Sequence, residues 1–157
     1  MGDAAAWTTA SAEETRALAE ALGRAARAGD ALLLEGPLGA GKTCFVQGLA
    51  RGLGVATPVR SPTFVLVTQH RGRATLAHVD LYRVEGASSL EDLGLEEYRD
   101  DAVLAVEWGE KLEGRFDDAM VVTLAEDGPD RRRVTARARG ARGREWLEAW
   151  MQGAVAR

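Results

Sequence analysis

One segment constrains the fold more than any other part of the chain, because three local patterns follow one another in it. Residues 31–35 read Ala-Leu-Leu-Leu-Glu, and a short continuous apolar run of this kind is typical of a strand buried on both faces. Residues 36–43 read Gly-Pro-Leu-Gly-Ala-Gly-Lys-Thr and match G-x-x-x-x-G-K-[ST] in full. Residues 42–53 then read as a helix, with apolar side chains expected to face inward. A strand, a glycine-rich loop and a helix in this order predict a phosphate-binding loop (P-loop) in an α/β fold.

The composition of this loop has a physical basis. Glycines let the backbone curl until successive N–H groups point inward at phosphate oxygens, and the helix N-terminus adds a partial positive charge at the same point. We expect Lys42 to supply a full charge to the β- and γ-phosphates and the Thr43 hydroxyl to bind Mg²⁺. An ordinary glycine-rich turn is the alternative, and the complete motif between strand and helix argues against it. The expected ATP-binding residues here are Gly36, Leu38, Gly39, Ala40, Gly41, Lys42, Thr43 and Cys44.

Composition limits the class of protein. A length of 157 residues suits one domain, 1–157, and 46% hydrophobic with 28% charged residues is typical of a soluble globular protein. A net charge of −4 argues against a strongly basic nucleic-acid binder. The single cysteine excludes an intramolecular disulfide and fits a reducing compartment. With no bilayer-spanning apolar run and no signal-peptide pattern, we expect a cytoplasmic location.

Further elements can be assigned along the chain. Ser11 and Glu14 form a capping box at the start of a helix that is expected to reach about Ala28. A second capping box, Ser88 with Glu91, predicts a short helix through Leu93, and residues 95–99 are expected to add another turn of helix. Residues 1–10 are expected to be a short lead-in. Strands are predicted at 64–70, 75–80, 102–106, 119–125 and 132–139, the first two as an antiparallel hairpin, and a last helix at 145–152.

Two carboxylates end predicted strands that follow the loop. Asp80 ends the strand 75–80, and Glu107 follows the apolar run 102–106. P-loop enzymes place a carboxylate at such a position to hold Mg²⁺, which prefers hard oxygen ligands. The alternative for either residue is a solvated strand end. If both act, one holds Mg²⁺ and the other orients or deprotonates the attacking water.

Ser61 and Thr63 lie between the P-loop helix and the predicted hairpin, within Arg-Ser-Pro-Thr. Switch segments of P-loop proteins occupy this position, and their hydroxyls sense the γ-phosphate. A plain proline-containing turn explains the same residues equally well.

Several P-loop classes do not fit the chain. A GTPase needs a base-reading N-K-x-D element, which is absent, and residues 80–83 lack the glycine of D-x-x-G. The chain is too short for the helical lid domain of an AAA+ ATPase. A small-molecule kinase has an arginine-bearing lid, whereas residues 84–100 are short and acidic.

An ordered set of segments resembles one family closely. The set comprises the loop 36–43, Ser-Pro-Thr-Phe at 61–64, His-Val-Asp-Leu-Tyr-Arg at 78–83, Leu-Gly-Leu-Glu-Glu-Tyr at 93–98 and Glu-Trp-Gly-Glu-Lys at 107–111. Together they resemble the TsaE (YjeE) family, the ATPase component of bacterial tRNA threonylcarbamoyladenosine biosynthesis. The resemblance runs from about residue 11 to about residue 111 and is weaker beyond. It implies a three-layer α/β/α P-loop NTPase fold, with parallel strands in the core of a mixed sheet and antiparallel strands at its flanks.

The resemblance also implies roles for individual residues. Thr43 and Glu107 would ligate Mg²⁺, and Asp80 would be the catalytic carboxylate, acting with Lys42. Ser61 and Thr63 would belong to the switch loop. Trp108 would lie beside the nucleotide. Cys44 stands where the family usually has threonine.

The resemblance further implies ATP and Mg²⁺ as cofactors and the TsaB–TsaD pair as partners. TsaD would transfer threonylcarbamoyl to tRNA adenosine (position 37), so that tRNA is met through this complex rather than directly. Slow ATP hydrolysis that resets the complex is the first hypothesis. A nucleotide-dependent binding module without essential hydrolysis is the second, and a small-molecule kinase is the third, for which no acceptor-binding motif is visible.

Other residues are assigned more generally. Thr9 or Ser11 is expected to flank the adenine, and Arg132 to approach the adenine or the phosphates. The arginines between 131 and 144 are expected on a solvated strand face rather than against tRNA phosphates. His78 is expected to be a hydrogen-bonded structural histidine rather than a site residue, and His70 to be solvated. Trp146 and Trp150 are expected in the core.

Overall fold

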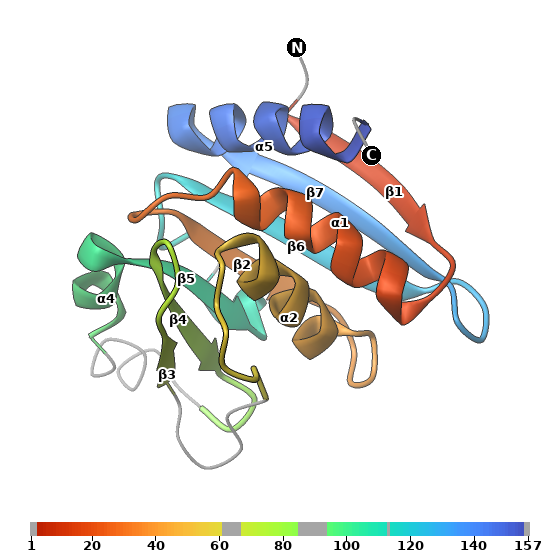
Figure 1. Cartoon of the computed structure of the whole chain (residues 1–157), viewed down its shortest axis with the longest axis horizontal. Helices are drawn as coiled ribbons and strands as arrows, with labels where there is room; N and C mark the ends of the chain where they lie inside the picture. The colour runs from red at the N-terminus through yellow and green to blue at the C-terminus, as the bar shows by residue number, and fades with distance from the viewer. Residues whose placement is uncertain (1–2, 61–66, 85–93, 113, 156–157) are drawn as a thin grey trace.

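The computed structural model describes residues 3–60, 67–84, 94–112 and 114–155. Its centre is a seven-stranded mixed sheet of order β1-β7-β6-β2-β5-β4-β3 (Figure 1). The strands are β1 (Ala4–Thr9), β2 (Ala31–Glu35), β3 (Val67–His70), β4 (Thr75–Asp80), β5 (Ala102–Glu107), β6 (Ala119–Glu126) and β7 (Arg132–Arg139). The helices are α1 (Ala12–Arg24), α2 (Lys42–Gly52), α4 (Leu95–Asp101), the short 3₁₀ helix η1 (Gly109–Leu112) and α5 (Gly140–Val155).

Parallel pairing forms the middle of the sheet. Strand β2 pairs in parallel with both β5 and β6, and β4 pairs in parallel with β5. Antiparallel pairs flank this core, with β3 on β4 at one edge and β7 and β1 beyond β6 at the other. The predicted mixed sheet is therefore confirmed. The carboxyl ends of β2, β4 and β5 meet at the same edge of the sheet, and ligands of open α/β sheets bind at that edge.

The two faces of the sheet are covered separately. Helices α1, α2 and α5 pack on one face, where Phe45, Trp146 and Trp150 join the larger core (Figure 1). Helix α4 and η1 cover part of the other face, where Leu95 and Leu112 join the second core. The expected three layers and the core positions of both tryptophans are confirmed.

The ends of several elements differ from the predictions. Residues 4–9 form β1 rather than a lead-in, because they pair antiparallel with β7. The strand signal of Trp7, Thr8 and Thr9 is short, and the three alanines before them add nothing to it. Helix α1 ends at Arg24 instead of near residue 28, where the Arg73 guanidinium binds the Gly23 and Ala26 carbonyls. Helix α5 is longer than predicted at both ends, and Asp118 accepts a bond from the Arg142 N–H in its first turn.

Other predicted elements agree with the structure or cannot be compared with it. The strands at β2, β4, β5, β6 and β7 agree to within a residue or two, and β3 and β4 form the expected antiparallel pair. Residues 95–101 are helical, as predicted. The second capping box, Ser88 with Glu91, and the first part of the strand 64–70 lie outside the described residues.

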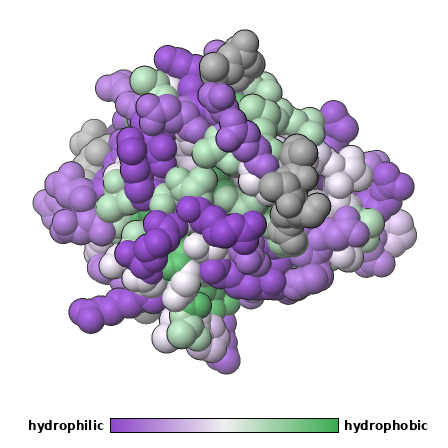
Figure 2. All heavy atoms as spheres, turned by 45° about the horizontal axis from the view of Figure 1, so that its top comes forward, coloured by the Kyte–Doolittle hydropathy of each residue, from purple (hydrophilic) through white to green (hydrophobic). Residues whose placement is uncertain are grey.

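The face of the molecule in Figure 2 is mostly polar. Figure 2 tilts the top of Figure 1 toward the viewer and shows hydrophilic residues over most of this side, with hydrophobic residues in smaller areas between them. Among the described residues, the exposed large hydrophobic side chains are Leu38 and Tyr82. No helix in the described part of the chain is long and apolar enough to cross a membrane.

Candidate nucleotide site

The glycine-rich loop joins β2 to α2 in a conformation that only glycine adopts readily. Gly39 has φ 83° and Gly41, the N-cap residue of α2, has φ 104°. Gly36 has φ 149°, and a Cβ there would lie 2.6 Å from the Leu124 carbonyl oxygen. Positive φ values of this kind strain residues with a side chain. The backbone is thus curled at the N-terminus of a helix, where anions bind favourably.

Lys42 is buried within the loop that it follows. Its Nζ donates to the carbonyl oxygens of Gly36 at 2.5 Å and Pro37 at 3.0 Å, and it lies 3.9 Å from the ring centroid of Trp108. Burial lowers the pKa of Lys42, and the charges of Glu107, Glu110 and Asp80 oppose that shift, Glu107 most strongly. A cation held over an aromatic face beside carboxylates is placed to meet an anionic group at the loop.

Glu107 connects the loop helix to the sheet. The Thr43 hydroxyl lies 3.1 Å and 3.0 Å from the two carboxylate oxygens of Glu107. Glu107 is buried at the end of β5, next to β2, where its register partner is Leu34. The same carboxylate lies 2.6 Å from His78 Nε2. His78 is therefore hydrogen-bonded, as expected, and its partner is one of the candidate site residues.

Asp80 lies beside Glu107 for a topological reason. Strands β4 and β5 are parallel neighbours, and Asp80 and Glu107 are register partners at their carboxyl ends. The Asp80 Oδ1 accepts the backbone N–H of Tyr82 at 2.9 Å. The structure thus brings both predicted carboxylates to the edge where the loop begins.

Lys111 supports the turn after Asp80, and sequence reasoning gave it no role. Its Nζ donates to the Leu81 and Val84 carbonyls at 2.6 Å and 2.7 Å. The available signal was its place in the segment Glu-Trp-Gly-Glu-Lys, four residues after Glu107. Lys111 and η1 hold the chain that follows β4 against the chain that follows β5.

Trp108 contacts the lysine and a second aromatic side chain. Trp108 is the non-glycine residue with positive φ, 61°, in the described part of the chain. Its ring lies over Lys42 and 5.1 Å from the Tyr82 ring. Leu38, in the loop itself, is 76% exposed and Tyr82 is 53% exposed. Trp108 thus lies against Lys42, and its expected place beside the nucleotide stays a prediction.

The residues expected near the adenine come from β1, the start of α1 and β7. Arg132 begins β7 opposite Thr9 of β1, and its guanidinium binds the Ala40 carbonyl at 3.1 Å and approaches that of Gly39 at 3.4 Å. Cys44 is half-buried, with Sγ 3.4 Å from the Ala12 carbonyl oxygen. Arg132 and the start of α1 therefore converge on the P-loop and the first turn of α2.

The hydroxyls at this point already have structural partners. Ser11 caps α1 by accepting the Glu14 N–H at 3.1 Å, as predicted. The Glu14 carboxylate accepts the backbone N–H of Ala10 at 3.0 Å rather than that of Ser11, so the second bond of the capping box is made one residue earlier than predicted. Thr9 is buried and bonds Thr15 at 2.6 Å, oxygen to oxygen. Contact between an adenine and Ser11 or Thr9 stays a prediction.

Ser61 and Thr63, the expected switch residues, lie outside the described residues. The expectation that His70 is solvated is wrong, because it is buried and its Nδ1 lies 3.0 Å from the Thr57 hydroxyl. The strand 67–70 packs this side chain against the loop after α2.

The arginines between 131 and 144 do not form one uniform surface. Arg133 and Arg137 are exposed, in accord with the expected solvated strand face. Arg142 instead forms an ion pair with the buried Asp30 at 2.7 Å, and Arg132 holds the loop. Sequence spacing alone did not separate these structural arginines from the solvated ones.

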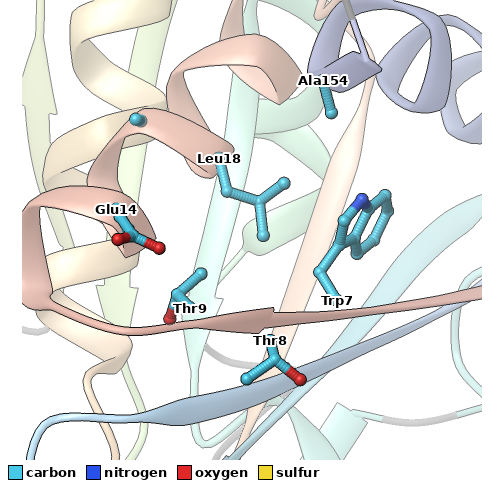
Figure 3. A pocket seen from close by; sticks show the side chains of 7 residues that line it. Trp7, Thr8, Thr9, Glu14, Leu18 and Ala154 are labelled. Carbon is cyan, nitrogen blue, oxygen red and sulfur yellow. The ribbon is translucent and has the colours of Figure 1, made fainter. Parts of the chain in front are cut away.

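A hollow lies beside Thr9, one of the residues expected near the adenine. It is formed by β1, α1 and α5, and Figure 3 shows Leu18 projecting into it between Trp7 and Thr9. Its lining includes Glu14 but no lysine or arginine, so its chemistry does not suit phosphate. We therefore place the candidate nucleotide site at the loop and not in this hollow.

The chain is similar to known proteins in both sequence and fold. A family model for "Threonylcarbamoyl adenosine biosynthesis protein TsaE" matches residues 9–134. The chain belongs to the TsaE family. The tRNA threonylcarbamoyladenosine biosynthesis protein TsaE of Bacillus subtilis (strain 168) is 42% identical over 139 residues, which cover 87% of this chain and 87% of that protein. The protein of the same name from Treponema pallidum (strain Nichols) is 39% identical over 112 residues, 71% of this chain and 83% of that protein.

A solved structure supports the same assignment. The crystal structure of Bacillus subtilis YdiB matches this fold with a TM-score of 0.81 at 32% sequence identity, and the match covers 97% of each chain. The TsaE match at 9–134 includes the loop, both carboxylates, Trp108 and Arg132. The resemblance drawn from the ordered motifs is thus confirmed, and so is the fold that it implied.

The donor set at the end of β5 suits one kind of metal. Among the described residues, no group of three or more His, Cys, Asp and Glu side chains is arranged to hold a metal ion. Thr43 and Glu107 instead offer hydroxyl and carboxylate oxygens beside a phosphate-binding loop. Mg²⁺ is usually held in this manner, by few protein oxygens together with phosphate oxygens and water. The residues present therefore fit a magnesium–nucleotide complex.

Proposed function

We propose that this chain is a Mg²⁺-dependent ATPase that supports threonylcarbamoylation of tRNA adenosine by acting on the TsaB–TsaD complex. The family takes part in tRNA threonylcarbamoyladenosine biosynthesis, as the names of its members say. The observation that carries the ATPase assignment is the convergence of Lys42, the Thr43–Glu107 pair and Asp80 at the glycine-rich loop. In this proposal the TsaB–TsaD complex binds the tRNA, and this chain does not contact tRNA directly.

Each residue has a separate task in the proposed reaction. The loop N–H groups and Lys42 bind and orient the phosphates, Lys42 exchanging its loop carbonyl partners for phosphate oxygens. Thr43 and Glu107 hold Mg²⁺, which when bound neutralises charge on the transferred phosphoryl group. Asp80 orients the attacking water or accepts its proton. Trp108 keeps solvent away from Lys42 on one side.

The positions of the two carboxylates favour Glu107 as the metal ligand and Asp80 as the group that orients water. Glu107 is buried and bonded to Thr43, the hydroxyl that the motif assigns to the metal. Asp80 is one strand further from β2 and is less buried. A metal ligand must lie at the loop helix, whereas a water-orienting group needs access to solvent.

Phosphate release measured with the purified chain tests the proposal. We expect slow Mg²⁺-dependent release from ATP by the chain alone, and a change in rate when TsaB and TsaD are added. Co-purification with TsaB–TsaD in ATP and in ADP gives a second readout, and we expect the two nucleotides to differ. Absence of ATP consumption under all conditions would contradict the enzyme assignment. Release that the partners do not alter would favour a nucleotide-dependent binding module.

A further inference from the structure

We propose that His78 is a positioning residue, which holds the Glu107 carboxylate in the orientation needed at the magnesium site. This inference rests on the proposed function, because it assigns Glu107 to the metal. It adds a residue from a different strand to the site. His78 does not itself touch the nucleotide in this proposal.

The position of His78 follows from the alternation of β4. The neighbouring side chains of Ala77 and Val79 belong to the core on the α4 side, whereas Leu76 belongs to the core on the α2 side. His78 has the same parity as Leu76 and therefore faces α2. The first turn of α2 carries Thr43, so the strand directs the imidazole at the Thr43–Glu107 pair.

The contact is short and fully enclosed. His78 is 0% exposed, and its Nε2 lies 2.6 Å from Glu107 Oε2. A carboxylate only accepts hydrogen bonds, so Nε2 must carry the proton that is donated to it. Thr43 bonds the same carboxylate from α2. Glu107 is thereby held from two sides, by the loop helix and by the neighbouring strand.

The second ring nitrogen argues against a role in packing alone. His78 Nδ1 is buried and has no hydrogen-bond partner among the described residues. An unpaired buried polar atom is unfavourable, and an apolar side chain of similar size would fill the space without it. Within the described part of the chain, the hydrogen bond of the imidazole is made to Glu107. The polar contact of His78 is therefore the one with the Glu107 carboxylate.

Such outer partners of metal ligands usually matter for metal affinity. Losing one typically costs about 10–100-fold in metal affinity or activity, because the ligand loses its fixed orientation. A histidine that only fills the core would instead lower stability without a selective effect on Mg²⁺. The two roles can be distinguished by the increase in ATP affinity that Mg²⁺ causes. Loss of a positioning residue reduces this increase, whereas loss of a core residue does not.

The test compares ATP affinity in Mg²⁺ with ATP affinity in EDTA by calorimetry. His78→Asn is too short to reach Glu107, and we expect it to reduce the Mg²⁺-dependent gain by about tenfold or more, with affinity in EDTA unchanged. His78→Gln carries an N–H at a reach similar to Nε2 and is expected to restore most of the gain. His70→Asn is the matched control, since the other histidine is also buried but bonds Thr57. It is expected to keep the wild-type gain.

The outcomes distinguish this inference from the proposed function. A wild-type protein without any Mg²⁺-dependent gain would overturn both. A normal wild-type gain that His78→Asn retains would overturn the role of His78 alone. Equal losses in Mg²⁺ and EDTA would also overturn it, because they show a general effect on the fold.

A measurement on the unaltered protein makes the test independent of variant folding. Nitrogen NMR of histidine-labelled protein reports which ring nitrogen bears the proton, and the chain has two histidines, which His70→Asn separates. We expect His78 to be protonated at Nε2, with slow exchange of that proton. A neutral His78 ring protonated at Nδ1 would contradict the inference, because Nε2 could not then donate to Glu107.

Discussion

At the residue scale, the two carboxylates of the candidate site differ in the partners that hold them. Glu107 is bonded by Thr43 and His78, whereas the bond described for Asp80 comes from the Tyr82 backbone N–H. The motifs alone left the roles of these carboxylates interchangeable until the family was considered. Because their partners differ, replacing Asp80 and replacing Glu107 are expected to have different effects.

Replacement of Asp80 by asparagine is expected to affect turnover more than binding. A group that positions the attacking water acts mainly in the transition state, so Asp80→Asn should leave Mg–ATP affinity within a few-fold. Hydrolysis should fall by at least an order of magnitude, since such groups contribute about 10²–10⁴-fold. Single-turnover kinetics beside calorimetry would show this. Asp101→Asn, an exposed carboxylate at the opposite end of β5, is the control.

Two results would count against this role of Asp80. Normal hydrolysis in Asp80→Asn would make it a strand-end residue without a catalytic part. A joint loss of affinity and turnover that excess Mg²⁺ restores would identify Asp80 as the metal ligand, and the two carboxylates would have to exchange roles.

Glu107→Ala and Thr43→Ala are expected to act on metal-dependent binding. Both side chains offer oxygen ligands at one point, so each change should weaken ATP binding in Mg²⁺ by about tenfold or more and should alter binding in EDTA much less. Calorimetric titrations in both conditions check this, with Asp101→Ala as control. Equal losses with and without Mg²⁺ would place Glu107 away from the metal.

The reactivity of Cys44 provides a test based on pH. Burial raises the pKa of the Cys44 thiol, mainly by desolvating the thiolate. A raised pKa leaves less thiolate at any pH below it, and the thiolate is the nucleophile. At neutral pH, iodoacetamide should therefore alkylate Cys44 more slowly than it alkylates glutathione. The alkylation rate of Cys44 should still rise with pH at values where the rate for glutathione no longer changes. Equal or faster alkylation would contradict this environment.

At the element scale, α1 and α2 approach each other through glycines. A Cβ at Gly48 would lie 2.2 Å from the Arg16 carbonyl oxygen, and one at Gly52 would lie 2.2 Å from that of Glu20. Gly23 on α1 meets the Leu49 carbonyl oxygen in the same way. This close contact fixes α2, and therefore the loop at its start, against the N-terminal part of the chain.

Gly48→Ala is expected to destabilise the fold. The added methyl group meets backbone atoms, which cannot move away without separating the helices, so the free energy of unfolding should fall by about 1–3 kcal/mol. Gly153→Ala is the matched control on α5, where the nearest contact of a new Cβ would be Ala21 at 3.7 Å. It should be neutral or slightly stabilising, by up to about 1 kcal/mol of helix propensity. Equal effects in chemical denaturation would argue against the close helix contact.

The elements predicted well from sequence are those determined by local patterns. The segment from β2 to α2 has a buried strand, turn glycines and a helical repeat, and each follows from nearby residues. Strand β1 was missed because pairing with β7 makes it a strand, not its alanine-rich sequence. The ends of α1 and α5 were misplaced because Arg73 and Asp118, distant in sequence, fix them.

At the scale of the whole molecule, the order of the strands creates the site. Asp80 and Glu107 were predictable as strand ends, but their adjacency depends on parallel pairing of β4 with β5 beside β2. The contacts of His78 and Lys111 were not predictable, since each crosses from one strand or helix to another. Arg132 was expected near the adenine or the phosphates only in general terms, and the pairing of β7 with β6 and β1 is what brings it to the loop.

Binding of Mg–ATP to Lys42→Ala tests the central claim, that the glycine-rich loop is an ATP site. Lys42 is the lysine buried in the loop, and a charged hydrogen bond is worth about 1.5–3 kcal/mol. Arg27→Ala removes one exposed positive charge that pairs with Glu145 and serves as the control. Calorimetric titration is predicted to show ATP affinity reduced by about tenfold or more in Lys42→Ala and unchanged in Arg27→Ala. Wild-type affinity and turnover in Lys42→Ala would contradict the account.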